Sequence, residues 1–257
     1  MITLKQIVAQ HAARAVSRTV VRPGAEGLIA LPSQRTDSLT YRAGTITSRQ
    51  DSFAGTALLQ NHAGDWGHVW SKSGVIGANA LQCVSGRVAG TASASDGDLY
   101  TCAWPFAGAD GTVYAGLYVA TRTGGSMALY VRGGSAGDGY YAQHVDNVGW
   151  SITRRQAGTI SSLGTAGPST LVPGSVYAMR FGAWGSTLTL TVAGTAIISA
   201  VDTAFPGAGS IGLNIGKSAA AAGYQAQAFG AVSVGNYPIF IIGVHNPDDG
   251  TTPRYVP

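Results

Sequence analysis

The chain reads SVYAMRFGAWGSTLTLTVAGTAIISAVDTAFPGAGSIGLNIG from Ser175 to Gly216, and this stretch decides the fold. Side chains alternate between two faces over residues 176–181 and again over residues 187–192, which predicts two β-strands. Gly185 and Gly194 supply the tight turns that follow each strand. The stretch therefore predicts an antiparallel sheet that buries one face and exposes the other.

The order of these strands and turns resembles a known fold family. A strand with an aromatic residue and an arginine leads through a glycine turn to the LxLxV pattern of Leu188–Val192, and a loop then closes on Ser210–Leu213. This pattern resembles the late strands of the concanavalin A-like jelly roll, the sandwich of laminin G-like domains, legume lectins and many glucanases. The run Asp51–Gly86 resembles the opening of the same sandwich. The resemblance implies an all-β antiparallel sandwich, and it implies little about activity, because functions reside in sites grafted on folds.

We expect three parts in a chain of 257 residues. Residues 1–50 are predicted to form an N-terminal α-helix and an extended basic anchoring arm. Residues 51–235 are predicted to form the jelly-roll β-sandwich, with Trp70 pointing inward and Ala226–Val234 as a closing strand beside the first one. Residues 236–257 are predicted to form an apolar, proline-rich C-terminal arm.

The predicted helix covers residues 3–18. Thr3 suits the N-cap, and Gln6 completes a capping box. An isolated helix of this length is marginal in water, so its apolar stripe must be buried against its own sandwich or against another chain. The C-terminal arm also holds a strongly apolar run, so both ends are predicted to be attachment segments. The expected assembly residues are Leu4, Ile7, Val8, Arg14, Arg18, Ile239, Phe240 and Ile241.

Charge is scarce and unevenly distributed. Charged residues make up 11% of the chain, and glycine contributes 37 residues, which is typical of a sandwich with many turns. Residues 1–50 carry seven basic and two acidic residues, whereas residues 51–257 carry nine basic and ten acidic ones. The excess positive charge therefore belongs to the N-terminal arm. We expect this arm to dock on an acidic neighbouring protein, and nucleic acid is the less favoured alternative.

Two patterns bear on where the protein resides. No stretch approaches the ~18 consecutive apolar residues that span a bilayer. Polar and basic residues interrupt residues 1–21, where a secretion signal needs an unbroken apolar region. We therefore expect no membrane span and no signal peptide. Cys83 and Cys102 lie in consecutive predicted strands, and in such a chain we favour free buried thiols over a disulfide.

The acidic residues do not predict an enzyme. Glycosidases on this fold use paired carboxylates, and the family's catalytic strand carries E-x-D-x-x-E. This sequence has one glutamate, Glu26, which lies in the N-terminal arm. Asp96 with Asp98, or Asp138 with Asp146, could form a pair, but their glycine neighbours indicate turns. We expect no catalytic residues, and a diverged glycan-degrading enzyme is the least favoured hypothesis.

We also expect no metal or other cofactor. Legume lectins and laminin G-like domains often hold calcium with Asp and Asn oxygens, so calcium is the alternative. The loop residues that offer such oxygens are Asp96, Asp98, Asp110, Asp138, Asp146, Asn147, Asp248 and Asp249. No spacing among them matches a defined calcium loop. The five histidines are scattered, which argues against zinc.

Aromatic and planar polar side chains in adjacent predicted strands suggest a carbohydrate site. The expected binding residues are Tyr140, His144, Arg154 and Trp184. Tyr140 and His144 are predicted to face outward, while Tyr141, Val145 and Trp150 are predicted to face the core. The alternative is that these residues serve mainly the core, and that Trp184, at a turn, belongs to a protein interface.

Together these features predict a non-enzymatic structural protein of a virion, of the phage minor tail or tail-fibre type. We expect it to be made in the host cytoplasm, to form a homo-oligomer and to bind other virion subunits through both termini. Its jelly roll is expected to mediate assembly and to contact a host-surface glycan. The alternatives are a stand-alone carbohydrate-binding, lectin-like module and a capsid decoration protein.

Overall fold

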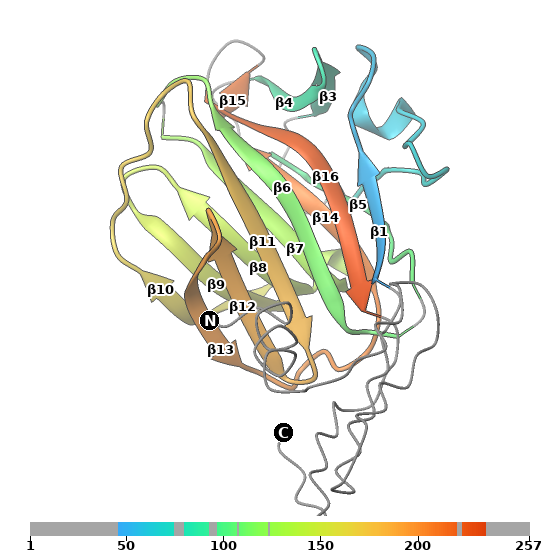
Figure 1. Cartoon of the computed structure of the whole chain (residues 1–257), viewed down its shortest axis with the longest axis vertical. Helices are drawn as coiled ribbons and strands as arrows, with labels where there is room; N and C mark the ends of the chain where they lie inside the picture. Colours follow the sequence, from blue (N-terminus) through green and yellow to red (C-terminus); the bar gives the residue numbers. More distant parts are fainter. Residues whose placement is uncertain are drawn as a thin grey trace, which may run out of the picture. The chain divides into compact units, whose positions relative to one another are not determined.

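Two antiparallel β-sheets form a sandwich in the structure, which is a computed structural model (Figure 1). It describes residues 46–234, apart from 75–79, 93–96, 107, 123 and 220–222. The predicted concanavalin A-like antiparallel sandwich is confirmed. The predicted helix, residues 1–45 of the N-terminal arm, the C-terminal arm and the expected assembly residues lie outside the described residues. Residues 46–50, which were assigned to the arm, belong instead to a strand of the sandwich.

The larger sheet has nine strands. They are β1 (Ile46–Asp51), β3 (Leu81–Val84), β4 (Arg87–Ala92), β6 (Gly111–Val119), β11 (Val176–Trp184), β12 (Thr187–Val192), β13 (Thr195–Val201), β15 (Ser218–Ala219) and β16 (Tyr224–Val234). Their order is β13-β12-β11-β6-β16-β4-β15, with β1 beside β16 and β3 beside β4. The closing strand thus pairs with the first one as predicted, although β1 begins before the expected start of the sandwich at Asp51.

The smaller sheet has seven strands in the order β10-β9-β8-β7-β14-β5-β2. They are β2 (Ser71–Lys72), β5 (Leu99–Ala103), β7 (Ser126–Gly133), β8 (Gly139–Val145), β9 (Gly149–Gln156), β10 (Thr159–Ala166) and β14 (Ser210–Gly216). Two short 3₁₀ helices, η1 (Leu59–Asn61) and η2 (Ser135–Gly137), lie in loops. In the described part of the chain, no helix is long and apolar enough to cross a membrane.

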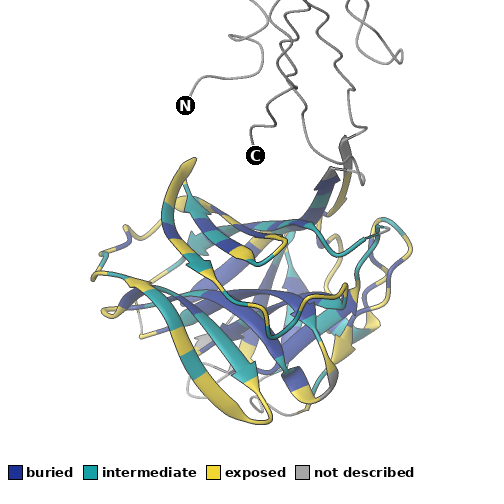
Figure 2. Ribbon diagram, turned by 90° about the horizontal axis from the view of Figure 1, so that it is seen from below, coloured by how far each residue is buried: buried dark blue, intermediate teal, exposed yellow. Residues whose placement is uncertain are grey.

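The core lies between the two sheets, as Figure 2 shows by its buried strands and exposed turns. Strand β6 alternates strictly between buried and half-buried residues, as expected for a strand with one face in the core. In the decisive stretch, Met179, Phe181, Leu188 and Leu190 are buried as the alternation predicts. Trp70 is also buried. The sequence pattern therefore identified the inner face of these strands correctly.

The two cysteines are free and buried, as favoured from the sequence. The prediction that they lie in consecutive strands was wrong. Cys83 lies in β3 of the larger sheet and Cys102 in β5 of the smaller one, with β4 between them in the sequence. Burial raises the pKa of the Cys83 thiol to about 11, so little reactive thiolate forms near neutral pH.

Candidate functional site

Two of the predicted glycan-binding residues, Tyr140 and His144, face the core instead of the solvent. The hydroxyl of Tyr140 donates a 2.7 Å hydrogen bond to Asp202. Nε2 of His144 lies 3.0 Å from Oγ of Ser169, and burial lowers the pKa of His144. The prediction that these two side chains point outward was wrong.

The reason lies in the sequence of β8, GYYAQHV, where Tyr140 and Tyr141 are neighbours, so that aromatic rings occur on both faces of the strand. Its alternation cannot decide which face is inner. The pairing decides it, because His144 pairs with Met127 and Trp150, and both of these are buried in the main core. Trp150 therefore faces inward as predicted. Val145 is only half-buried and shares the outward parity of Tyr141, so its inward prediction was wrong.

The other two predicted residues lie in different sheets, and Arg154 meets Tyr140 at the carboxylate of Asp202. Arg154 forms an ion pair with Asp202, with 2.8 Å between Nη1 and Oδ2. Trp184 is 40% exposed at the end of β11 in the larger sheet. The four predicted residues therefore do not form one site, and Trp184 alone offers an open aromatic surface.

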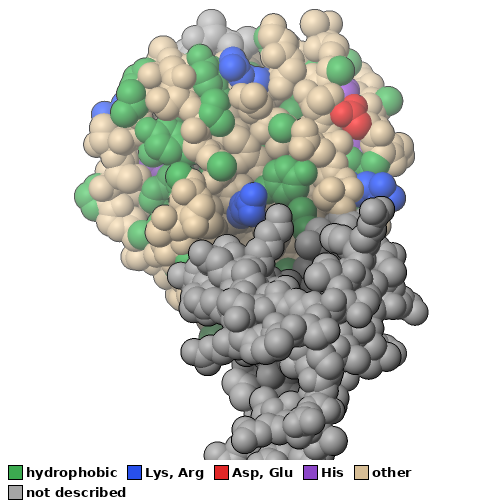
Figure 3. All heavy atoms as spheres, viewed as in Figure 1, with side chains coloured by type: hydrophobic (Ala, Val, Ile, Leu, Met, Phe, Trp, Pro, Cys, Tyr) green, Lys and Arg blue, Asp and Glu red, His purple; other side chains and the backbone are tan. Residues whose placement is uncertain are grey.

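Trp184 belongs to the outer face of the larger sheet, which Figure 3 shows in front. Since Met179, Phe181 and Ala183 of β11 are buried in the core, the alternate residues point outward. The strand register extends this face across β6, β16 and β4. We call it the Tyr114 face, and its central residues are Arg87, Thr112, Tyr114, Gly116, Tyr118, Ala178, Arg180, Gly182, Trp184, Gln227 and Gly230.

The ring of Tyr114 reaches over Gly230, which leaves room for it. The two residues pair across β6 and β16. A Cβ at Gly230 would overlap Cζ and Oη of Tyr114. The Tyr114 hydroxyl lies 3.4 Å from the carbonyl oxygen of Arg49 and 3.3 Å from Oε1 of Gln50, both on β1. The end of the ring is thus held against β16 and β1, while the side chain as a whole stays half-buried.

Trp184 has a similar arrangement over Gly182. A Cβ at Gly182 would lie 3.2 Å from Nε1 of Trp184 and 3.1 Å from Oγ1 of Thr112. Gly182 lies two strand spacings from Gly230 across the sheet and two residues from it along the strands. In ideal strand geometry this separates the two glycines by roughly 12 Å. The face therefore presents two aromatic side chains, each against a glycine of the sheet.

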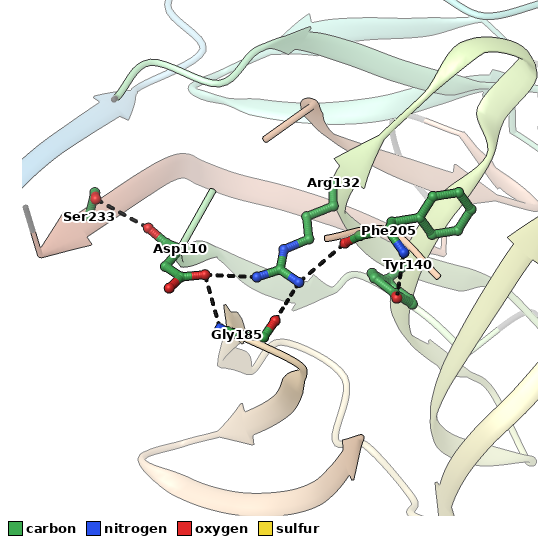
Figure 4. A network of polar contacts seen from close by, with 6 residues as sticks. All are labelled: Asp110, Arg132, Tyr140, Gly185, Phe205 and Ser233. Carbon is green, nitrogen blue, oxygen red and sulfur yellow. Dashed lines mark hydrogen bonds and ion pairs between the residues drawn. The ribbon is translucent and has the colours of Figure 1, made fainter. Parts of the chain in front are cut away.

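A buried arginine fixes the turn that carries Trp184 (Figure 4). Arg132, from the smaller sheet, donates to the carbonyl oxygen of Gly185 at 2.6 Å and to that of Phe205 at 3.2 Å. Asp110 accepts from Arg132 at 2.8 Å and from the backbone N–H of Gly185 at 3.0 Å. Arg132 and Asp110 thus bind both the carbonyl oxygen and the N–H of Gly185, the residue that follows Trp184.

Polar groups surround the two rings. Arg180 is exposed and pairs with Tyr114 across the strands, and Gln227 is exposed on β16. The guanidinium of Arg87 lies 3.8 Å above the ring centre of Tyr118, so this tyrosine is covered. In Figure 3 acidic atoms appear only near one margin of the face. The Tyr114 face therefore combines flat aromatic surface with amide, hydroxyl and guanidinium groups.

The outer face of the smaller sheet differs. Tyr130 and Tyr141 point outward there and pair across β7 and β8, yet both are buried. Their hydroxyls donate to the carbonyl oxygens of Asp138 and Gly137, in the connection between the two strands. This connection folds back over the rings, so the smaller sheet presents mainly Ser, Thr and Gln side chains between its loops.

A buried polar cluster surrounds Asp51 at the end of β1. Its carboxylate accepts from Nε2 of His62 at 2.8 Å, from Nε1 of Trp70 at 3.0 Å and from the Phe53 N–H at 2.9 Å. Nε2 of His68 lies 3.0 Å from the same carboxylate. Burial alone would raise the pKa of Asp51, but these groups outweigh it and hold the pKa at about 2.

Ligand-type atoms of Asp51, His62 and Asp65 lie within 4.8 Å of one another in the described region. A carboxylate has about four acceptor positions, and four nitrogen atoms already surround that of Asp51. The cluster as it stands therefore fits a structural role, with the carboxylate compensating buried N–H groups, better than a cation site.

The aspartates within the described ranges all accept hydrogen bonds from the protein itself. These residues are Asp51, Asp65, Asp98, Asp110, Asp138, Asp146 and Asp202. The pKa values of Asp146 and Asp202 are lowered, because hydrogen bonds and nearby arginines outweigh burial. A general acid of a glycosidase needs a raised pKa instead. Asp96, Asp248 and Asp249 lie outside the described residues.

No protein-family model matches this sequence, and no curated protein matches it. Solved structures do. A prokaryotic β-1,3-1,4-glucanase (lichenase) from a mouse hindgut metagenome is 12% identical with a TM-score of 0.52, covering 73% of this chain and 99% of its own. The Bacillus licheniformis β-glucanase is 12% identical with a TM-score of 0.50, covering 72% and 96%. The fold is a concanavalin A-like jelly roll. Carbohydrate-binding module CBM66 from Bacillus subtilis is 19% identical over 62% of this chain and 91% of its own, with a TM-score of 0.49.

Sequence reasoning found Trp184 but missed Tyr114 and the two glycines beneath the rings. A signal was present in GTVYAGLYV, where Tyr114 and Tyr118 occupy the polar parity of a strict alternation. The glycine beneath Tyr114 lies on a strand more than a hundred residues later, and no local pattern connects the two.

Proposed function

We propose that this protein is a non-catalytic carbohydrate-binding module and that the Tyr114 face is its binding surface. One observation carries the proposal: the rings of Tyr114 and Trp184 lie against Gly230 and Gly182 on the outer face, where Trp184 is 40% exposed and Tyr114 is half-buried. A flat apolar surface with polar groups at its edge suits a sugar ring, which has C–H groups on its faces and hydroxyls around its rim. Rigid anchors also bind at low entropic cost, and Trp184 is fixed by the Gly185 turn.

The polar groups beside the rings support the same function. Thr112, Arg180 and Gln227 lie within one or two residue pairs of the rings. Hydroxyl, guanidinium and amide groups can exchange hydrogen bonds with sugar hydroxyls. The family resemblance and the similar glucanase structures agree with a glycan ligand.

The proposal is non-catalytic because the described aspartates are engaged in the structure, and residues 46–234 contain no glutamate. The virion hypothesis rests on the terminal segments, which lie outside the described residues, and on composition. The structures named above are not virion proteins. We therefore place carbohydrate binding first, and tail assembly stays a prediction about residues 1–50 and 236–257.

Affinity measurements with the full chain test this function. A glycan array identifies a bound polysaccharide, and titration calorimetry then compares Trp184→Ala and Tyr114→Ala with the unchanged protein. We expect each substitution to weaken binding about tenfold, since central aromatic anchors dominate such interfaces. No release of reducing ends is expected from the bound polysaccharide.

The matched control is Ile160→Ala, which removes an even more exposed apolar side chain from the other sheet. It should leave affinity unchanged. If the array shows no glycan binding, or if Ile160→Ala weakens binding as much as Trp184→Ala does, the Tyr114 face is not the site.

A further inference from the structure

The charges on the Tyr114 face indicate what kind of glycan it takes. Among the nine strands of the larger sheet, the single acidic residue is Asp51, which is buried and turned toward the core. Arg87 and Arg180 both lie on the outer face of that sheet. In its described part, the face therefore has positive charge that no acidic residue of its strands offsets.

Five other arginines lie in the described region. Arg155 donates to the carbonyl oxygen of Ala136, and Arg49 on β1 is in none of the ion pairs, but the remaining three are held by carboxylates. Arg122, Arg132 and Arg154 form ion pairs with Asp146, Asp110 and Asp202. Arg87 and Arg180 are in none of the ion pairs found among the described residues. Arginines without a carboxylate partner are free to bind an anionic group of a ligand.

Their geometry suits planar anions. Cζ of Arg87 lies 3.8 Å from the ring centre of Tyr118, so the ring fixes the position of this guanidinium, whose N–H groups point outward within its own plane. Arg180 stands beside the Tyr114 ring, and three strand spacings separate it from Arg87, roughly 15 Å. Each arginine would thus meet its own anionic group, with the Tyr114 ring close to Arg180.

From these observations we infer that the ligand of the Tyr114 face is a carboxylate-bearing, uronate-type polysaccharide, an inference that rests on the proposed function. The planar fork of arginine matches a carboxylate with two parallel hydrogen bonds. Two arginines supply little charge, whereas nucleic acids and densely sulfated chains are bound by more extended basic patches. The hydroxyls of Thr112, Thr189 and Thr191 and the amide of Gln227 match the hydroxyl-rich remainder of a uronate chain.

The experiment uses the full chain, and its central comparison is between two ligands that differ only in charge. Polygalacturonate is compared with its fully methyl-esterified form, which keeps the sugar rings and removes the carboxylates. Alginate and hyaluronate are tested as further carboxylate polysaccharides. Dextran sulfate, a single-stranded DNA and a neutral β-glucan are tested as sulfated, phosphate-bearing and uncharged ligands.

We expect at least one carboxylate polysaccharide to bind. If polygalacturonate is the one that binds, its fully methyl-esterified form should bind at least tenfold more weakly. Arg180→Gln and Arg87→Gln should each weaken this binding about fivefold. Arg155→Gln removes the same charge from β9 of the other sheet and should change it little. Higher salt should weaken binding by the unchanged protein more than binding by Arg180→Gln.

Each of the other possible outcomes contradicts the uronate inference, its assignment to the Tyr114 face, or the proposed function. Binding to neutral or esterified glycans that equals binding to carboxylate glycans overturns the uronate inference and leaves the proposed function standing. Tighter binding of DNA or dextran sulfate overturns the inference in favour of those polyanions. An equal effect of Arg155→Gln means diffuse charge attraction and overturns the assignment to this face. No binding to any polysaccharide overturns the proposed function itself.

Discussion

The outer faces of the two sheets carry tyrosines at equivalent, outward positions, yet they expose them differently. On the larger sheet Tyr114 lies over Gly230 and stays half-exposed. On the smaller sheet Tyr130 is fully buried, because the connection after β7 covers it and accepts its hydrogen bond. The same residue type is thus a surface platform in one sheet and a structural anchor in the other. What decides between the two roles is the glycine or the loop that lies against the ring.

The largest difference between the faces should appear in stability. Tyr130→Ala removes a fully buried ring and should lower the free energy of unfolding by about 3–5 kcal/mol. Tyr114→Ala removes a half-exposed ring and should cost only about 1 kcal/mol. Urea denaturation of both variants measures the difference.

Tyr130→Phe serves as the control, because it keeps the ring and removes only the hydrogen bond to Asp138, at a cost of about 1 kcal/mol. Equal losses for the two alanine variants would mean that burial does not distinguish the faces.

Stability should depend on pH through a different group in each sheet. Asp51 in the larger sheet acts at low pH, and Tyr130 in the smaller sheet acts at high pH. The folded pKa of Asp51 is about 2, below its ordinary 3.8, so its contribution is complete above about pH 4 and is lost as the pH falls toward 2. This loss is about 2 kcal/mol and acts on β1, which holds the Tyr114 hydroxyl. Burial raises the pKa of Tyr130 to about 12 from 10.0, so its contribution is complete below pH 10 and is lost as the pH rises toward 12.

Melting temperatures across the pH range measure both limbs. Asp51→Asn should flatten the acid limb, and Tyr130→Phe should flatten the alkaline limb. An acid limb that is as steep in Asp51→Asn as in the unchanged protein contradicts the assignment to Asp51.

The smallest effect concerns the space beneath Trp184. Gly182→Ala places a Cβ 3.1 Å from Oγ1 of Thr112 and 3.2 Å from Nε1 of Trp184, so these neighbours must shift by a few tenths of an ångström. We expect glycan affinity to fall about threefold, while stability changes by less than about 1 kcal/mol. Gly134→Ala, whose Cβ meets no atom closer than 3.7 Å, is the control and should change neither. Unchanged affinity in Gly182→Ala would show that the position of Trp184 is not limiting.

Much of the fold could be predicted from the sequence, because alternation and glycine turns are local signals. They identified the inner faces of β11 and β12 and the pairing of the closing strand with the first. The alternation failed in β8, where both parities carry aromatic rings, so Tyr140 and His144 were assigned to the wrong face. Within the candidate site, only Trp184 was predicted from the sequence, since an aromatic residue beside a glycine turn is a local signal as well.

The sequence by itself determined that this chain forms a nearly uncharged antiparallel sandwich, since residue spacing and turn residues act over a few positions. Only the tertiary structure decided which tyrosines remain accessible and which arginines lack a carboxylate. Both depend on contacts between strands far apart in the chain, such as Tyr114 with Gly230 and Arg132 with Asp110 and Gly185. Such contacts are set by strand register and by loops folding over a face, and no local pattern encodes either.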